Sequence, residues 1–367
     1  MKYYIIAGET SGDLHGSNLM KHIKIQDLKA KFRFWGGDLM LKESPNIVKH
    51  YKETAFMGIS DVLLNINTVF KNIIICKKDI LEFNPDAVIL IDYPGFNLRI
   101  AKFAKQNNFK VHYYISPKVW AWNTKRAYKI KKNVDYLYSI LPFEVNFYKD
   151  FGVKPNYIGN PLCDAIETYP FESNFKENYQ LKKPLIALLP GSRKSELRHI
   201  LPAMVSVVEG FPDYEFVLAG AHHLSDEMYA ELTQNKVRII KGKTYDILKN
   251  AHAALVCSGT ATLETALLGC PQVVCYKFSK LSYFVGRLVI KIKYISLVNL
   301  ILDKPAVKEL IQNELTKTNL YNELKSILQG KKRQAMFDDY DKLNTIVGKA
   351  GASERAAKLI VDRTTKG

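Results

Sequence analysis

Residues 253–266 read AALVCSGTATLETA, and this stretch decides the fold. An apolar run to Cys257 predicts a buried strand, and the small, polar residues 258–261 predict a tight turn into a helix. The first amides of a helix lack internal partners and carry the positive end of its dipole. Gly259 lets a ligand approach the backbone, and Glu264 lies one turn inside, where a carboxylate can accept hydrogen bonds from a ribose. The stretch predicts either a phosphate or diphosphate site or a capped helix after a strand.

The overall composition favours a folded protein with an anionic partner. The chain has 367 residues, enough for two α/β domains, and 47% of them are hydrophobic. The net charge of +17 favours nucleic acid, an acidic membrane surface or a phosphorylated substrate. Because the basic residues are spread along the chain rather than clustered with aromatic residues on one element, nucleic-acid binding is disfavoured.

The cysteines and the hydropathy pattern bear on compartment. The five cysteines form no C-x-x-C pair and are odd in number, which favours buried thiols in a reducing compartment; they are Cys76, Cys163, Cys257, Cys270 and Cys275. The apolar run after Lys2 is too short for a signal peptide, and no uncharged apolar run reaches 18 residues. We therefore expect neither a signal peptide nor a transmembrane helix.

The first half of the chain alternates strand-like and helix-like segments. Strands are expected at 3–7, 32–35, 86–91, 110–115, 136–141 and 156–158. The loop 8–13 follows the first strand, at the edge where a doubly wound sheet binds its ligands; its candidate residues are Gly8, Ser11, Gly12 and Asp13. Asp92 follows the strand 86–91, so it is either a general base for a substrate hydroxyl or a turn residue.

A second set of alternating elements follows a polar linker at 165–184. Strands are expected at 185–189, 215–219, 237–241, 254–257 and 272–276. We predict an α/β protein with two Rossmann-like, doubly wound domains facing a cleft. The domains are placed at 1–168 and 169–335. A helical tail at 336–367 is expected to pack on the first domain or on a partner.

The second domain carries chemistry at its first strand end. Ser192 and Arg193 lie in the turn after strand 185–189, and an arginine there is suited to bind a diphosphate. With the turn at 258–261 on the same sheet edge, it would stabilise a nucleotide leaving group. Metal chemistry is weakly supported, because Asp339-Tyr340-Asp341 follows no strand and is interpreted as a solvated helix face. His222 and His223 are interpreted as a surface loop.

The stretch 60–83 is more apolar than one buried helical face requires, and it contains Lys71, Lys77 and Lys78. One interpretation is a helix docked in the core. The other is a helix whose second apolar face meets lipid while its lysines meet anionic head groups.

Several short motifs occur in one order along the chain. They are Ala7–Asp13 (AGETSGD), Met57–Ile59 (MGI), Ile91–Asn97 (IDYPGFN), Ser116–Trp122 (SPKVWAW), Leu141–Glu144 (LPFE), Leu189–Arg193 (LPGSR), Ser258–Ala261 (SGTA) with Glu264, and Tyr294–Leu300 (YISLVNL). In this order, over residues 2 to about 314, they resemble the lipid-A-disaccharide synthases, which are GT-B glycosyltransferases.

The resemblance implies an inverting hexosyltransferase of lipid A biosynthesis. Such enzymes transfer 2,3-diacylglucosamine from its UDP derivative to 2,3-diacylglucosamine 1-phosphate. The products are the β-1,6-linked disaccharide 1-phosphate and UDP. No metal or other cofactor is expected.

The resemblance also implies roles for single residues. Asp92 matches the family's proposed base and Arg193 its essential arginine. The UDP side is expected to comprise Ser192, Arg193, Ser258, Gly259, Thr260, Ala261, Glu264 and Asn299. The acceptor side is expected to comprise Gly8, Ser11, Gly12, Asp13, Met57 and Gly58. The chain departs from the common family pattern at Thr10, His15, Gly95 and Val298, and the last departure bears on Asn299.

The two substrates that the resemblance implies carry phosphate groups and acyl chains. The net positive charge of the chain would therefore attract both the substrates and an anionic membrane surface. We expect a cytoplasmic protein bound peripherally to the cytoplasmic face of the inner membrane, with no nucleic-acid partner; a homodimer stays open. The alternatives are another GT-B enzyme, such as the peptidoglycan N-acetylglucosaminyl transferase or a UDP-sugar epimerase, and a basic, non-catalytic lipid- or nucleic-acid-binding protein.

Overall fold

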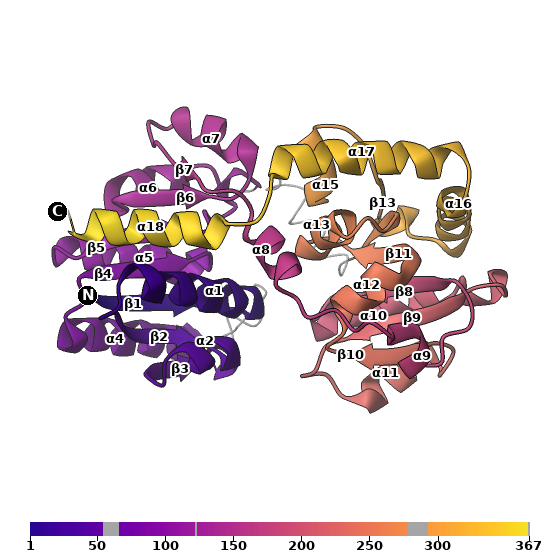
Figure 1. Cartoon of the computed structure of the whole chain (residues 1–367), viewed down its shortest axis with the longest axis horizontal. Helices are drawn as coiled ribbons and strands as arrows, with labels where there is room; N and C mark the ends of the chain where they lie inside the picture. Colours follow the sequence, from indigo (N-terminus) through magenta and orange to yellow (C-terminus); the bar gives the residue numbers. More distant parts are fainter. Residues whose placement is uncertain (54–65, 122, 278–292, 366–367) are drawn as a thin grey trace. The chain divides into compact units, whose positions relative to one another are not determined.

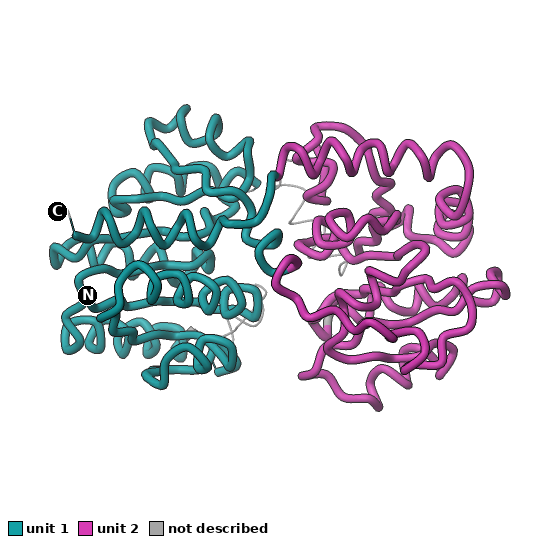
Figure 2. The backbone as a smooth tube through the Cα atoms, in the orientation of Figure 1, with its two compact units in different colours: residues 1–165, 348–367 teal, residues 166–347 magenta. Residues whose placement is uncertain are grey.

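The computed structural model describes residues 1–53, 66–121, 123–277 and 293–365. The chain divides into two compact units, shown in different colours in Figure 2. Unit 1 comprises Met1–Ala165 and Gly348–Gly367, and unit 2 comprises Ile166–Val347. Each unit is built on one parallel sheet, so the predicted α/β class with two Rossmann-like domains is confirmed (Figure 1).

Unit 1 contains a seven-stranded parallel sheet in the order β3-β2-β1-β4-β5-β6-β7. Its strands are β1 (Lys2–Ala7), β2 (Lys31–Gly36), β3 (Ile47–His50), β4 (Ala87–Ile91), β5 (Lys110–Tyr114), β6 (Tyr136–Ser139) and β7 (Asn156–Tyr157). Its α-helices are α1 (Thr10–Gln26), α2 (Asp38–Glu43), α4 (Ile66–Phe83), α5 (Pro94–Gln106), α6 (Arg126–Asn133), α7 (Pro142–Lys149) and α18 (Ala352–Thr365). Helix α8 (Pro161–Glu167) contains the boundary to unit 2.

The sheet of unit 1 is buried on both faces, as a parallel sheet requires. Alternate residues of β1 enter two different cores. Tyr3 and Ile5 pack with residues of α1, α2 and α18. Tyr4 and Ile6 pack with residues of α4, α5, α6 and α7. The ligand-binding edge of the sheet is therefore held from both sides.

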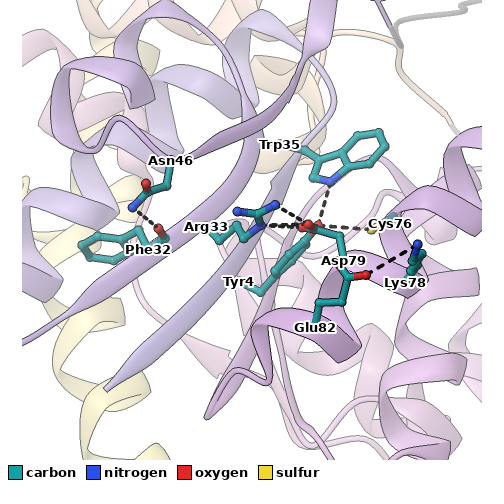
Figure 3. Close-up of polar contacts among 9 residues, drawn as sticks. All are labelled: Tyr4, Phe32, Arg33, Trp35, Asn46, Cys76, Lys78, Asp79 and Glu82. Carbon is teal, nitrogen blue, oxygen red and sulfur yellow. Dashed lines mark hydrogen bonds and ion pairs between the residues drawn. The ribbon is translucent and has the colours of Figure 1, made fainter.

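A polar network fixes helix α4 to the sheet (Figure 3). The hydroxyl of buried Tyr4 donates to Oδ2 of Asp79 over 2.7 Å, and Nε1 of Trp35 donates to the Tyr4 oxygen over 2.8 Å. Nε of Arg33 donates to both carboxylate oxygens of Asp79 over 2.8 Å. Because these partners come from β1 and β2, they determine which face of α4 meets the core.

The opposite face of α4 exposes large apolar side chains. Phe70 is 53% exposed, Ile74 67% and Leu81 50%. These residues repeat at helical spacing, with the exposed Lys71 and Lys78 among them. Residues 60–65 of the apolar stretch lie outside the described residues. Among the helices of the described ranges, none is long and apolar enough to cross a membrane.

Unit 2 contains a six-stranded parallel sheet in the order β10-β9-β8-β11-β12-β13. Its strands are β8 (Leu185–Leu189), β9 (Glu215–Gly220), β10 (Arg238–Lys241), β11 (Ala251–Cys257), β12 (Gln272–Tyr276) and β13 (Lys308–Ile311). Its helices are α9 (Phe175–Asn178), α10 (Lys194–Val205), α11 (Asp226–Thr233), α12 (Thr244–Asn250), α13 (Thr260–Leu267), α15 (Leu297–Leu302), α16 (Lys317–Leu328) and α17 (Lys331–Val347). All five residues of β8 are buried, which is typical of a central strand covered on both faces.

The C-terminal helices differ from the expected tail. The expected boundary at 335/336 falls inside α17, which belongs to unit 2 because Met336, Tyr340 and Leu343 are buried there. The interpretation of 339–341 as a solvated face is wrong for Asp339, which is buried and pairs with Lys304 at 2.7 Å. The unit boundary lies at 347/348 instead.

Helix α18 returns to unit 1 and packs against α1 (Figure 1). Asp164 caps its N-terminus, since Oδ1 accepts from the amides of Gly351 at 2.6 Å and Ala352 at 3.0 Å, and Oδ2 accepts from that of Ser353 at 2.7 Å. The other expected boundary, at 168/169, lies three residues beyond the observed division at 165/166.

Candidate active site

In unit 2, two predicted turns lie together at the point where the strand order reverses. The order turns between β8 and β11, and parallel sheets of this kind bind ligands outside the strand ends at such a point. Strand β8 leads into the turn that carries Arg193, and β11 leads into the turn at 258–261. A β-carbon on Gly191 would lie 3.4 Å from Sγ of Cys257, so the two turns are in contact.

The turn at 258–261 presents open backbone at the start of a helix. Gly259 has φ 145°, a conformation that favours glycine, and a β-carbon added there would meet no atom within 4 Å. Helix α13 begins at Thr260 with no side-chain cap and no acidic residue in its first turn. The amides of this turn are therefore suited to an anion. The Ser258 hydroxyl donates to the carbonyl of Ile295 over 2.9 Å.

Arg193 is oriented by a glutamate of its own helix. It precedes α10, and its Nη1 donates to Oε1 of Glu196 over 3.0 Å. Burial raises the pKa of the Glu196 carboxyl, and Arg193 opposes that shift. The Arg193 side chain is 48% exposed, so its fork retains N–H groups for an anion. Ser192 is exposed, and its carbonyl lies 2.9 Å from Nε2 of His223.

Glu264 is held by a tyrosine from the neighbouring helix α12. The hydroxyl of Tyr245 donates to Oε1 of Glu264 over 2.7 Å. Burial raises the pKa of the half-buried Glu264 carboxyl, and the hydrogen bond from Tyr245 opposes the shift. One carboxylate oxygen is thereby fixed, and the other has capacity to accept further hydrogen bonds.

Asn299 is engaged inside unit 2. Its Nδ2 donates to the carbonyl of Val307 and to Oε1 of Glu309, both over 2.9 Å. Its Oδ1 accepts from the amide of Val307 over 2.9 Å, and the residue is 1% exposed. Glu309 also accepts from the amides of Ile295 and Ser296. This geometry favours a role for Asn299 in positioning the segment that Ser258 contacts.

In unit 1, the strand order reverses between β1 and β4, and the loop 8–13 and Asp92 follow these two strands. Asp92 and Tyr93 follow β4 with φ 41° and 47°, a conformation that non-glycine residues seldom adopt. The Asp92 carbonyl accepts from the hydroxyl of Tyr113 over 2.6 Å and from Nδ2 of Asn97 over 2.9 Å. These two bonds hold the strained backbone that places the Asp92 side chain.

The environment of Asp92 makes it a stronger base than an ordinary aspartate. Burial raises the pKa of its carboxyl, while Lys118 and the backbone amide of Tyr93 act in the opposite direction. A carboxyl with a raised pKa retains more affinity for a proton at neutral pH, which suits a general base.

The loop after β1 lies against the loop after β4. A β-carbon on Gly8 would fall 2.4 Å from the ring of Tyr93, so only glycine fits beneath that ring. Ser11 is exposed in the first turn of α1, and Gly12 packs against Ala7. The structure therefore brings Gly8 to the strand end that carries Asp92, and Ser11 follows three residues later in α1.

Asp13 has a different part in the structure. Its Oδ1 accepts from the amides of Gly37 at 2.8 Å and Met40 at 3.0 Å, and its Oδ2 accepts from that of Leu39 at 3.0 Å. It is 2% exposed and caps α2. Direct contact of its carboxylate with an acceptor is therefore disfavoured. Met57 and Gly58 lie outside the described residues.

Within the described ranges, no three His, Cys, Asp or Glu residues are grouped as a metal site would require. The five cysteines are free. Burial raises the pKa of Cys257 to about 12; Glu196 acts in the same direction and Arg193 in the opposite one. This thiol is thus a packing group between the two turns rather than a nucleophile.

Comparison with known proteins identifies the family. Residues 3–361 match the model of the lipid-A-disaccharide synthetase family. The lipid-A-disaccharide synthase of Syntrophus aciditrophicus is 38% identical over 97% of this chain and 96% of its own length. The chain belongs to the lipid-A-disaccharide synthetase family. The synthase of Trichlorobacter lovleyi is 34% identical over 97% of this chain and 96% of its own length.

Solved structures support the fold of this synthetase. The UDP-GlcNAc 2-epimerase of Neisseria meningitidis, bound to UDP-GlcNAc, has a TM-score of 0.67 with this chain at 13% identity. The match covers 100% of both chains. At this identity, the likeness concerns the fold alone.

Three residues that position side chains of the candidate site were not among those predicted. Glu196 had a usable signal, because it lies three residues after Arg193 at helical spacing. Tyr113 lies in the strand next to β4, and Tyr245 lies 19 residues before Glu264, so only the fold brings these tyrosines to their partners.

Proposed function

We propose that this chain transfers 2,3-diacylglucosamine from its UDP derivative to 2,3-diacylglucosamine 1-phosphate. The products are the β-1,6-linked disaccharide 1-phosphate and UDP. The observation that carries the proposal is the family match over residues 3–361. The two strand-order reversals, each with predicted site residues at its strand ends, support it.

We assign the base role to Asp92. Its carboxylate takes the proton from the 6-hydroxyl of the acceptor, and the resulting oxygen attacks the anomeric carbon of the donor. The bond from that carbon to the diphosphate oxygen breaks, and UDP leaves with the electron pair. A single displacement of this kind inverts the anomeric centre.

Unit 2 would stabilise the leaving group. The diphosphate accepts hydrogen bonds from Arg193 and from the amides at the start of α13, because both carry positive charge where negative charge develops. Glu264 accepts hydrogen bonds from the ribose, and Ser192 and Ser258 flank the diphosphate. Asn299 acts by positioning the segment that Ser258 contacts. Because these groups supply the positive charge, we expect turnover without an added metal.

The exposed face of α4 supports peripheral membrane binding. Phe70, Ile74 and Leu81 would enter the head-group region, and Lys71 and Lys78 would contact anionic lipids. We therefore propose that the protein binds to the cytoplasmic face of the inner membrane, where its acylated substrates would reside. Association of two copies stays a prediction.

The direct test is an assay of the full chain with the UDP donor and the acceptor 1-phosphate in detergent micelles containing EDTA. We expect disaccharide formation by the wild type and a loss of at least about 100-fold in kcat for Asp92→Asn, with UDP binding retained. The matched control is Asp150→Asn, which changes an exposed aspartate of the same unit. Epimerised UDP-sugar in place of disaccharide would identify a UDP-sugar epimerase instead. Full turnover by Asp92→Asn would remove the base assignment.

A further inference from the structure

A basic pocket in unit 1 is used by none of the groups assigned above. Helices α5 and α6 pack side by side, and a cavity of about 490 Å³ opens between them. This volume is within the range of small-molecule sites, about 300–1,000 Å³. Five cations line it, namely Arg99, Lys102, Arg126, Lys129 and Lys132, and its described lining contains no Asp or Glu. We call it the α5–α6 pocket.

The spacing of the cations in the sequence places them on one face of each helix, and both faces line the α5–α6 pocket. In α5, Gly95, Arg99 and Lys102 repeat at helical spacing, while Ile100 and Ala101 face the core. In α6, the cations at 126, 129 and 132 repeat similarly, while Ala127 and Ile130 are buried. If the basic faces of α5 and α6 served only to contact solvent, pointing them away from each other would reduce their mutual repulsion. Instead, the cations of both helices line the same pocket.

Four of the pocket cations have no carboxylate partner among the described residues. Among the ion pairs of the described residues, none involves Arg99, Lys102, Lys129 or Lys132. By contrast, Lys105 of α5, which does not line the pocket, pairs with Asp135. An anionic ligand would supply the missing negative charge.

Arg126 connects the pocket to the proposed base. Burial lowers the pKa of its guanidinium, Tyr113 opposes the shift, and Arg99 adds to it, so the two arginines lie within electrostatic reach. Tyr113 is the residue whose hydroxyl holds the Asp92 carbonyl at 2.6 Å. Gly95, three residues after Asp92, also lines the pocket, and a β-carbon there would meet no atom within 4 Å. The cavity thus opens at the strand–helix junction that carries Asp92.

We propose that the α5–α6 pocket binds a phosphate monoester, and that in the reaction this group is the 1-phosphate of the acceptor sugar. The assignment of the bound group to the acceptor rests on the proposed function. An acceptor with its 6-hydroxyl at Asp92 presents its phosphate on the other side of one sugar ring. Arginine forks match the geometry of phosphate oxygens, and two arginines line this pocket.

The first experiment measures binding without the reaction. Glucosamine 1-phosphate is titrated into the full-length protein at low salt, with glucosamine as the ligand that lacks phosphate. We expect binding of the phosphate ester only, competition by inorganic phosphate, and a loss of at least about tenfold in affinity for Arg99→Gln/Arg126→Gln. The control is Lys105→Gln/Lys131→Gln, which removes one cation from each helix outside the pocket.

The second experiment separates acceptor from donor. In detergent micelles free of phospholipid, the arginine double variant should raise the KM for the acceptor at least about tenfold, with the KM for the UDP donor unchanged. Arg99→Lys/Arg126→Lys keeps the charge and should lie between wild type and the glutamine variant. Circular dichroism checks that each variant is folded.

The outcomes distinguish the possible sources of phosphate. If the glutamine variant loses binding to phosphatidylglycerol vesicles while its acceptor KM is unchanged, the pocket serves membrane head groups and the acceptor assignment is overturned. If neither binding nor KM changes in folded variants, the whole proposal is overturned. If the wild type binds glucosamine 1-phosphate through the arginines yet forms no disaccharide, the phosphate site stands and the proposed reaction fails.

Discussion

The hydroxyl of Tyr245 donates a 2.7 Å hydrogen bond to Oε1 of Glu264, and this bond fixes the orientation of a carboxylate in the second turn of α13. Glu264 was predicted from its place in the sequence, but its orientation comes from α12. Ring contact with Tyr169 at 5.1 Å holds Tyr245 in turn. The proposed ribose ligand is therefore positioned by an aromatic pair that the sequence motif does not contain.

Tyr245→Phe should weaken UDP binding with little change in kcat. The variant removes one hydrogen bond to a carboxylate, which is worth about 1.5–3 kcal/mol, and leaves Glu264 free to turn away. We expect the Kd for UDP, measured by calorimetry, to rise by about tenfold or more.

The matched control is Tyr169→Phe, which removes a similar bond of 2.6 Å to Asp246 in the same unit. Tyr169→Phe should lower the thermal stability of the protein, but its affinity for UDP should stay at the wild-type value. Equal effects of the two variants on UDP binding would show that Glu264 has no special part in holding the donor.

Gly259→Ala should abolish tight UDP binding. At φ 145° an alanine is strained by about 1–3 kcal/mol, and its β-carbon enters the open space above the first amides of α13. Gly269→Ala is the control, because Gly269 also has positive φ, 70°, and open space around it, at the other end of the same helix.

Calorimetric titration with UDP and chemical denaturation measure the two effects. Both variants should lose stability, and only Gly259→Ala should lose more than about tenfold in UDP affinity. Wild-type affinity in Gly259→Ala would place the diphosphate elsewhere.

The parallel architecture could be read from the sequence because its central strands are continuous apolar runs. Ala87–Ile91 and Leu185–Leu189 are buried along their whole length, and polar turns follow both. The edge strands β3 and β13 gave no such signal, since each is partly exposed and contains a lysine. Their positions depend on pairing with neighbours rather than on local pattern.

The candidate site was predictable only where its residues lie in local strand–turn–helix patterns. Arg193 and Gly259 belong to such patterns. The carboxylate of Asp13 resembles a ligand group in the first loop, but its partners Gly37 and Met40 lie 24 and 27 residues away. The side chain of Asn299 also resembles a ligand group in the sequence. In the structure it forms hydrogen bonds with Val307 and Glu309, which the local sequence pattern does not predict.

Tyr4→Phe should destabilise unit 1 through the network that anchors α4. The variant removes the donor to Asp79 and leaves Nε1 of buried Trp35 without its 2.8 Å acceptor. An unsatisfied buried group costs about 1–3 kcal/mol, which should lower the urea midpoint without changing the slope. Tyr3→Phe is the control, because the Tyr3 hydroxyl makes a longer bond of 3.2 Å, to a partly exposed site. Equal midpoints for the two variants would contradict the anchoring role.

His15 lies in α1, close to the loop after β1, and is 5% exposed. Its Nδ1 has no hydrogen-bond partner. Burial lowers its pKa from 6.5 to about 4, and the nearby Asp164 opposes the shift. The neutral ring therefore occupies the core at neutral pH, and protonation is disfavoured in the folded state.

His15→Leu should make the protein more resistant to acid. In wild type, the unfolded state binds a proton at pH values below about 6.5, whereas the folded state binds it only near pH 4, so stability falls as pH decreases through this window. The full loss of stability is on the order of 3 kcal/mol, and the leucine variant removes this loss together with the unpaired nitrogen.

Urea denaturation at a series of pH values measures the difference in stability between wild type and His15→Leu. The free energies of unfolding of wild type and variant should run parallel between pH 7 and 8 and diverge from pH 6.5 to 4. Curves that stay parallel down to pH 4 would mean that His15 is protonated in the folded protein, paired with Asp164.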